Sequence, residues 1–151
     1  MEIFALNIKT MRYKTVNEII EIIKLFEDAI LPHEKWRHGE HLTMAMHYAL
    51  HYDFDEALNK MRSGILKLNV FHGVITTNDR GYHETLTVIW TRAVFDYVKA
   101  NPNKDLVEMA NEIIKKFDKN YPLKFYSREL LFSVEARYGF VESDLFHPTA
   151  F

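Results

Sequence analysis

The sequence predicts an all-α protein, organised as a single-domain bundle of five to six helices over residues 1–151. Apolar side chains recur at helical spacing along most of the chain, and no segment alternates between apolar and polar residues for long enough to indicate a β-strand. Capping residues, glycines and prolines separate the helical segments. The chain has 151 residues, enough to bury one sizeable core, and it contains no repeat, low-complexity tract or linker.

Two helices are expected in the first third of the chain. Thr15 and Glu18 have the spacing of a capping box, in which the two side chains satisfy free backbone amides at a helix start. The apolar stripe that follows ends at Pro32, because proline cannot continue a helix, so this helix is expected over residues 15–31. The second helix carries the histidine-rich stretch and ends near Tyr52.

Two longer helices are expected in the middle of the chain. A second capping box, at residues 53–56, begins the first of them, and Gly73 marks its end. The segment 74–82 is rich in residues that favour turns. It leads to a helix that starts at His83 and runs to about Ala100.

The last expected helices are shorter. Residues 106–117 show the cleanest apolar pattern in the chain, and the Asn-Tyr-Pro sequence at 120–122 breaks it. Ser127 and Ser133 both suit a helix N-cap, so the segment that ends at Gly139 is either one helix or two short ones.

Most of the eight histidines lie in the first two thirds of the chain. A helix advances about 100° per residue, which places His38 and His41 on the half of their helix that carries its apolar side chains. The opposite half, which is expected to face solvent or a partner, carries Glu40, Thr43, His47 and His51. Two histidines one turn apart are therefore predicted to point into the bundle.

A third histidine is predicted to join them from the later helix. His83 lies on the same apolar stripe as Trp90, whereas Thr85 takes the opposite side. If this helix packs beside the histidine-rich helix, the two axes lie about 8–10 Å apart. His83 would then meet His38 or His41 across the contact.

Three converging imidazoles can bind a metal ion or act in acid–base catalysis. His38, His41 and His83 are the candidate metal ligands for zinc, iron, manganese or nickel, with Glu84 or water completing the site. Without a metal, a histidine oriented by Glu84 could act as a general base, so these four residues are also the candidate catalytic residues. The opposing interpretation is that the histidines are core or helix-start residues, hydrogen-bonded to the backbone or to nearby tyrosines.

Aromatic and cationic side chains near the histidines suggest a binding pocket. Trp36, Tyr48 and Trp90 could wall an apolar cavity. Arg80 could hold an anion there, because it precedes a helix start with unpaired amides. The first functional hypothesis is a metal-dependent enzyme that acts on a small molecule. The alternative is a non-catalytic ligand-binding or interaction module, in which the histidines only line an aromatic pocket.

Composition argues against several other classes. The net charge is −2 with both signs mixed along the chain, so neither nucleic acid nor an anionic membrane surface is an expected partner. The absence of cysteine excludes disulfides, thiolate-held iron–sulfur clusters and thiol catalysis. No run approaches the roughly 18 apolar residues that span a bilayer, and the first residues lack the pattern of a secretory signal. We expect a cytoplasmic protein whose partner is a small molecule.

Three motifs resemble those of a known family. They are Trp-x-His-x-x-His-Leu at residues 36–42, Tyr-His-Glu-Thr-x-Thr at 82–87, and Phe-Ser-x-Glu-Ala-Arg-x-x-Phe-Val at 132–141. Together they look like a family of small bacterial all-α proteins of unassigned function, and the resemblance covers the chain from about the first helix to Leu145. The resemblance implies a shared pocket at four matching motif positions, His38, His41, His83 and Glu84. It implies no particular reaction.

Overall fold

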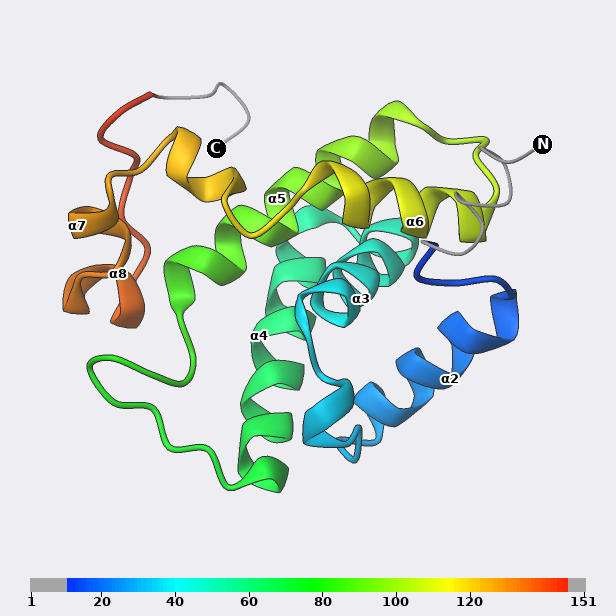
Figure 1. Cartoon of the computed structure of the whole chain (residues 1–151), viewed down its shortest axis with the longest axis horizontal. Coiled ribbons are helices and arrows are strands. Elements are labelled where there is room, and N and C mark those ends of the chain that lie inside the picture. Colours follow the sequence, from blue (N-terminus) through cyan, green and yellow to red (C-terminus); the bar gives the residue numbers. More distant parts are fainter. Residues whose placement is uncertain (1–10, 147–151) are drawn as a thin grey trace.

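The computed structural model describes residues 11–146, and in this part the chain is one bundle of α-helices without strands (Figure 1). The five substantial helices are α2 (Val16–Glu27), α3 (His38–His51), α4 (Phe54–His72), α5 (Glu84–Ala100) and α6 (Leu106–Lys116). The shorter elements are α7 (Arg128–Leu131), α8 (Val134–Tyr138) and the 3-10 turns His33–Lys35 and Tyr121–Lys124. The predicted all-α bundle is confirmed. The single domain was expected to span residues 1–151, and residues 1–10 and 147–151 lie outside the described part of the chain. None of the described helices is both long and apolar enough to cross a membrane.

The capping residues recognised in the sequence do begin and end these helices. Thr15 forms the expected reciprocal capping box with Glu18 at the start of α2. Asp53 accepts a hydrogen bond from the amide of Glu56 at the start of α4, at 2.8 Å. Gly73 ends α4 with a φ of 70°, in the left-handed region that glycine adopts without strain.

The first helix is shorter than expected. Helix α2 ends at Glu27, several residues before Pro32. Ala29 lies in the left-handed region, with a φ of 57°. The amide of Ile30 then donates back to the carbonyl of Leu25 at 2.9 Å, which is the closing bond of a Schellman turn. An alanine at this position carries no local signal of the kind that glycine provides, so the sequence pattern placed the end too late.

Helix α3 is the centre of the bundle. It packs most extensively against α5 and also contacts α2, α4 and α6, which confirms the expected pairing of the two histidine-bearing helices. The outward face expected for α3 is partly wrong, since Glu40 and Thr43 are 0% and 1% exposed. Arg12 covers Glu40 with two hydrogen bonds to its carboxylate, and Thr43 bonds the hydroxyl of Tyr13 at 2.7 Å. A helix surrounded by neighbours buries polar side chains that a one-sided pattern assigns to solvent.

A glycine inside α4 allows α2 to approach closely. A Cβ atom added at Gly64 would lie 2.3 Å and 2.5 Å from two carbons of the Phe26 ring. Phe26 is 1% exposed and also packs on Trp36 at a ring-centroid distance of 5.1 Å, so its ring has little room to move. The bare backbone of Gly64 thus sets the distance between α2 and α4.

We expect Gly64→Ala to lower the free energy of unfolding by about 1–3 kcal/mol, the usual cost of overpacking. Steric conflict should prevail although alanine is intrinsically the better helix former by about 1 kcal/mol. Urea denaturation measures the change, with Ser63→Ala, an exposed neighbour on α4, as the matched control. Phe26→Leu places a smaller side chain opposite residue 64. In the double variant, Gly64→Ala should therefore cost less stability than it does in the unsubstituted protein. A Gly64→Ala protein more stable than the unsubstituted one would contradict the close contact.

The C-terminal segment forms a second, smaller core at the start of α5. Ser127 and Ser133 each cap a helix, so the segment is two short helices, α7 and α8, rather than one. Tyr126 and Leu131 pack with Ile89 of α5 in this smaller core. Figure 1 shows α7 and α8 gathered at the end of α5 where that helix begins, apart from the contact between α3 and α5.

Candidate functional site

His83 is the N-cap of α5 and has both ring nitrogens occupied. Its Nδ1 accepts a hydrogen bond from the amide of Leu86 at 3.1 Å, and its Nε2 donates to the carbonyl of Leu131 at 2.7 Å. This pattern requires the neutral ring with the proton on Nε2. Burial lowers the pKa of His83, which favours the same neutral state. The residue is buried as expected, but its nitrogens join α5 to α7 and leave neither free for a metal or a proton transfer.

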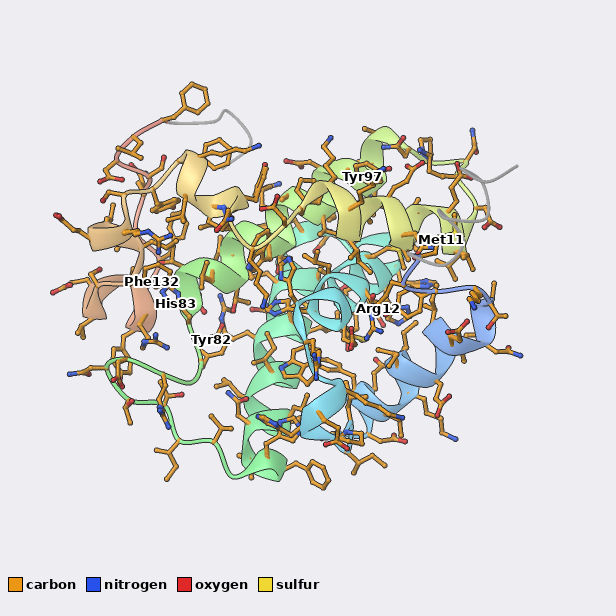
Figure 2. The ribbon with its side chains drawn as sticks, in the orientation of Figure 1. Met11, Arg12, Tyr82, His83, Tyr97 and Phe132 are labelled. Atoms are coloured by element: carbon orange, nitrogen blue, oxygen red, sulfur yellow. The ribbon has the colours of Figure 1, made fainter. Side chains whose placement is uncertain are left out.

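Two of the three sequence motifs bind each other at this end of α5. The Thr85 hydroxyl donates to the carbonyl of Gly139 at 3.0 Å and accepts from the amide of Val141 at 3.2 Å. Thr85 is therefore fully buried, contrary to the outward side that was expected for it, because the C-terminal segment covers this face of α5. Figure 2 shows His83 close to Phe132 where the two motifs meet.

Arg137 of α8 completes this junction. Its guanidinium donates hydrogen bonds to the carbonyls of Asn78, Gly81 and Tyr82, each at 3.2 Å, and the residue is only 7% exposed. The loop before α5 and the C-terminal helices are thus held together by one buried cation.

Glu84 binds an arginine and a tyrosine rather than a histidine. Arg62 of α4 holds both carboxylate oxygens, at 2.9 Å and 2.6 Å, and the Tyr82 hydroxyl donates to Glu84 at 2.6 Å. The hydrogen bonds from Arg62 are the main reason that the pKa of Glu84 lies below its ordinary value. The arrangement ties α4 to the start of α5, and it gives Glu84 no part in orienting an imidazole.

His38 is also held by the backbone. Its Nε2 donates to the carbonyl of Phe117 at 2.7 Å, and its ring packs on Trp90 with centroids 4.7 Å apart. Trp90 lies two turns along α5 from His83, a rise of about 10 Å. The structure therefore places His38 and His83 in different surroundings, although the helices that carry them are neighbours.

His41 differs from the other two histidines because its Nε2 atom is buried without a hydrogen-bond partner among the described residues. Its ring stacks on Trp36, with centroids 5.5 Å apart and planes 15° from parallel. Burial, and secondarily the charge of nearby His38, lower the pKa of His41 from 6.5 to about 4. The His41 ring is thus neutral at physiological pH.

The expected convergence of three histidines does not assemble a metal centre in the described structure. Within residues 11–146, no three histidine, aspartate or glutamate side chains lie close enough together to hold a metal ion. Of the two tryptophans predicted to wall a cavity, Trp36 stacks on His41 and Trp90 packs on His38. Arg80 is exposed in the loop before α5.

A pocket of about 420 Å³ lies between α2, α3 and α4, away from the start of α5. Its lining consists of Phe26, Glu27, Tyr48, Glu56, Asn59, Lys60, Ser63, Gly64 and Lys67. Tyr48, one of the predicted ligand-binding residues, donates its hydroxyl hydrogen bond to Glu27 at 3.2 Å. Burial, followed by the charge of Glu27, raises the pKa of Tyr48 well above its ordinary value, so the hydroxyl stays protonated.

The charged side chains of this pocket are balanced but not paired with one another. The pocket has two carboxylates, Glu27 and Glu56, and two ammonium groups, Lys60 and Lys67. None of these four side chains takes part in a salt bridge within the described part of the chain. The Lys60 ammonium instead lies over the ring of Tyr52, 4.6 Å from its centroid. These charges remain available to a bound molecule.

Sequence reasoning missed most of this pocket. It identified Tyr48 but assigned it to a wall shared with both tryptophans. A weak signal was present in α4, where Glu56, Lys60, Gly64 and Lys67 recur at spacings of four and three, and so share one helix face. A second pocket, of about 810 Å³, lies along α6 beside Met11. The walls of the first pocket all belong to α2, α3 and α4.

No protein-family model matches this chain, and neither the curated proteins nor the solved structures provide a match. The resemblance noted in the sequence therefore rests on its motifs alone. Those motifs lie mainly at the junction of α4, α5, α7 and α8, where their side chains bind one another and the backbone.

Proposed function

We propose that the protein is a non-catalytic binding module for a small polar molecule, and that the pocket between α2, α3 and α4 is its binding site. The observation that carries this proposal is the combination of a 420 Å³ pocket with four charged side chains that have no salt-bridge partner in the described chain. Ligand pockets usually enclose about 300–1,000 Å³ and fix their ligand with a few convergent polar groups.

The walls of the pocket support a preformed site. The rings of Phe26 and Tyr48 provide an apolar back wall, and Phe26 is held against Gly64 by the close contact between α2 and α4. This rigid back wall reduces the ordering cost of binding.

A metal-dependent enzyme at the three histidines is the less supported alternative. His83 uses both ring nitrogens in hydrogen bonds, His38 uses its Nε2, and Glu84 is held by Arg62. These are contacts that stabilise the fold, and they leave a non-catalytic function as the better explanation of the same residues.

The proposal is tested by titrating amino acids, diamines, dicarboxylates, sugar phosphates and zinc into isotope-labelled protein and following backbone amide signals. We expect saturable shifts at Glu27, Tyr48 and Lys60 with at least one organic class. Ser63→Trp, which places an indole at the exposed rim of the pocket, should abolish these shifts. Lys99→Trp, on an exposed position of α5 outside the pocket, should leave them unchanged.

Two outcomes would contradict the proposal. Shifts that persist in Ser63→Trp would place the ligand elsewhere. Saturable shifts only with zinc, reversed by a chelator and centred on His38 and His41, would favour the enzyme alternative.

A further inference from the structure

We propose that the ligand of this pocket is a compact zwitterion, with an ammonium group bound beside Glu27 and a carboxylate bound between Lys60 and Lys67. This inference rests on the proposed function and names its ligand class. Free amino acids and short ω-amino acids have this chemistry.

The wall formed by α2 and α3 is negative. Glu27 is the last residue of α2, so its carboxylate lies at the end of the helix where the backbone carbonyls concentrate partial negative charge. The Tyr48 hydroxyl donates to Glu27 and supports the ionised carboxylate from the α3 side. This wall suits an ammonium group, which can also rest on the faces of the aromatic rings.

The wall formed by α4 is positive around its centre. Lys60 and Lys67 lie two turns apart on one face of the helix, about 10 Å along the axis, with Ser63 and Gly64 between them. Their stems are long and flexible, so both ammonium groups can turn toward one anion above the intervening turn. The side chains of Ser63 and Asn59 offer hydrogen bonds at the same level.

The balance of charge selects against ligands of a single sign. Two carboxylates and two ammonium groups line the pocket, so a purely cationic ligand meets the lysines and a purely anionic ligand meets Glu27 and Glu56. Only a molecule that carries both a positive and a negative group can place each group beside a pocket side chain of the opposite charge. The volume of about 420 Å³ limits this molecule to a small skeleton.

A matched series of five-carbon probes tests the inference. The probes are 5-aminopentanoate, pentylamine and pentanoate, which share a chain and differ in their charged ends, together with L-valine, in which the two charges are adjacent. We expect 5-aminopentanoate or L-valine to bind about tenfold more tightly than either singly charged probe, by calorimetry or amide titration.

Charge-removing variants then assign each end of the ligand. Glu27→Gln should weaken the zwitterion and pentylamine by about five- to tenfold and leave pentanoate unchanged or slightly tighter. Lys60→Gln and Lys67→Gln should show the reverse pattern. Glu21→Gln and Lys99→Gln, which are exposed and outside the pocket, serve as folded controls of the same charge change.

The outcomes separate the inference from the function on which it rests. Equal affinity for a singly charged probe and the zwitterion, or equal loss of all probes in Glu27→Gln, would overturn the zwitterion while keeping a binding pocket. If none of the probes, and no member of the wider compound set, produces saturable shifts at the pocket amides, both proposals fail.

Discussion

Replacing Arg137 with alanine is expected to lower the free energy of unfolding by about 3–4 kcal/mol. The guanidinium is almost fully buried and donates to the carbonyls of Asn78, Gly81 and Tyr82. Its removal leaves a cavity between α8 and the loop before α5, and it leaves three carbonyls without this donor. Urea denaturation followed by circular dichroism measures the loss.

Companion variants identify the cause of the Arg137 effect. Arg128→Ala, an exposed arginine on the adjacent α7, should change stability by less than about 0.5 kcal/mol. Arg137→Lys keeps the charge but lacks the planar fork of donors, so it should recover only part of the loss. Amide exchange at Val141, which binds Thr85, should accelerate in Arg137→Ala. A loss below about 1 kcal/mol would mean that other contacts hold the junction.

Lowering the pH from 7 to 4 is expected to destabilise the protein by roughly 3 kcal/mol through His41 alone. Burial and the charge of His38 lower the pKa of His41 to about 4 in the folded protein, against 6.5 for the exposed side chain. Below pH 6.5 the unfolded chain therefore takes up a proton that the folded protein refuses. The contribution of His41 to stability is complete above pH 6.5 and falls as the pH drops toward 4, with about 2 kcal/mol lost at pH 5.

A substitution at His41 isolates this effect from the titration of carboxylates. His41→Phe removes the titrating nitrogen and keeps a ring against Trp36. Between pH 7 and 4 the variant should therefore lose less stability than the unsubstituted protein, and the difference should be about the His41 contribution given above. His51→Gln removes an exposed histidine from the same helix and should retain the full pH dependence. Identical pH dependence in His41→Phe and the unsubstituted protein would show that another group causes the loss.

The histidine-rich motifs illustrate how one residue type serves both chemistry and architecture. An imidazole can accept at one nitrogen and donate at the other, so it can cap a helix and bind a distant carbonyl at the same time. His83 does this at the start of α5, and His38 binds a carbonyl at the end of α6. For His38 and His83, contacts that connect helix ends therefore offer an explanation of the pattern that suggested metal ligands.

The fold class, the positions of most helices and several caps could be predicted from the sequence. These features are local, because a stripe repeats within one helix and a cap binds an amide three residues away. Thr15, Asp53 and Gly73 were recognisable for this reason. The burial of His83 and the pairing of α3 with α5 also followed from the apolar stripes of the two helices.

The partners of the polar side chains were decided only by the tertiary structure. Glu40 and Thr85 are buried because residues far along the chain cover them, and no helical periodicity records that cover. The direction of an imidazole is set by the carbonyl that lies within its reach. For His83 this is the carbonyl of Leu131, which is 48 positions away in the sequence. The pocket has the same origin, since its walls come from three helices and its width is set by Phe26 against Gly64. Contacts between distant residues depend on how helices pack, which periodicity within one helix does not specify.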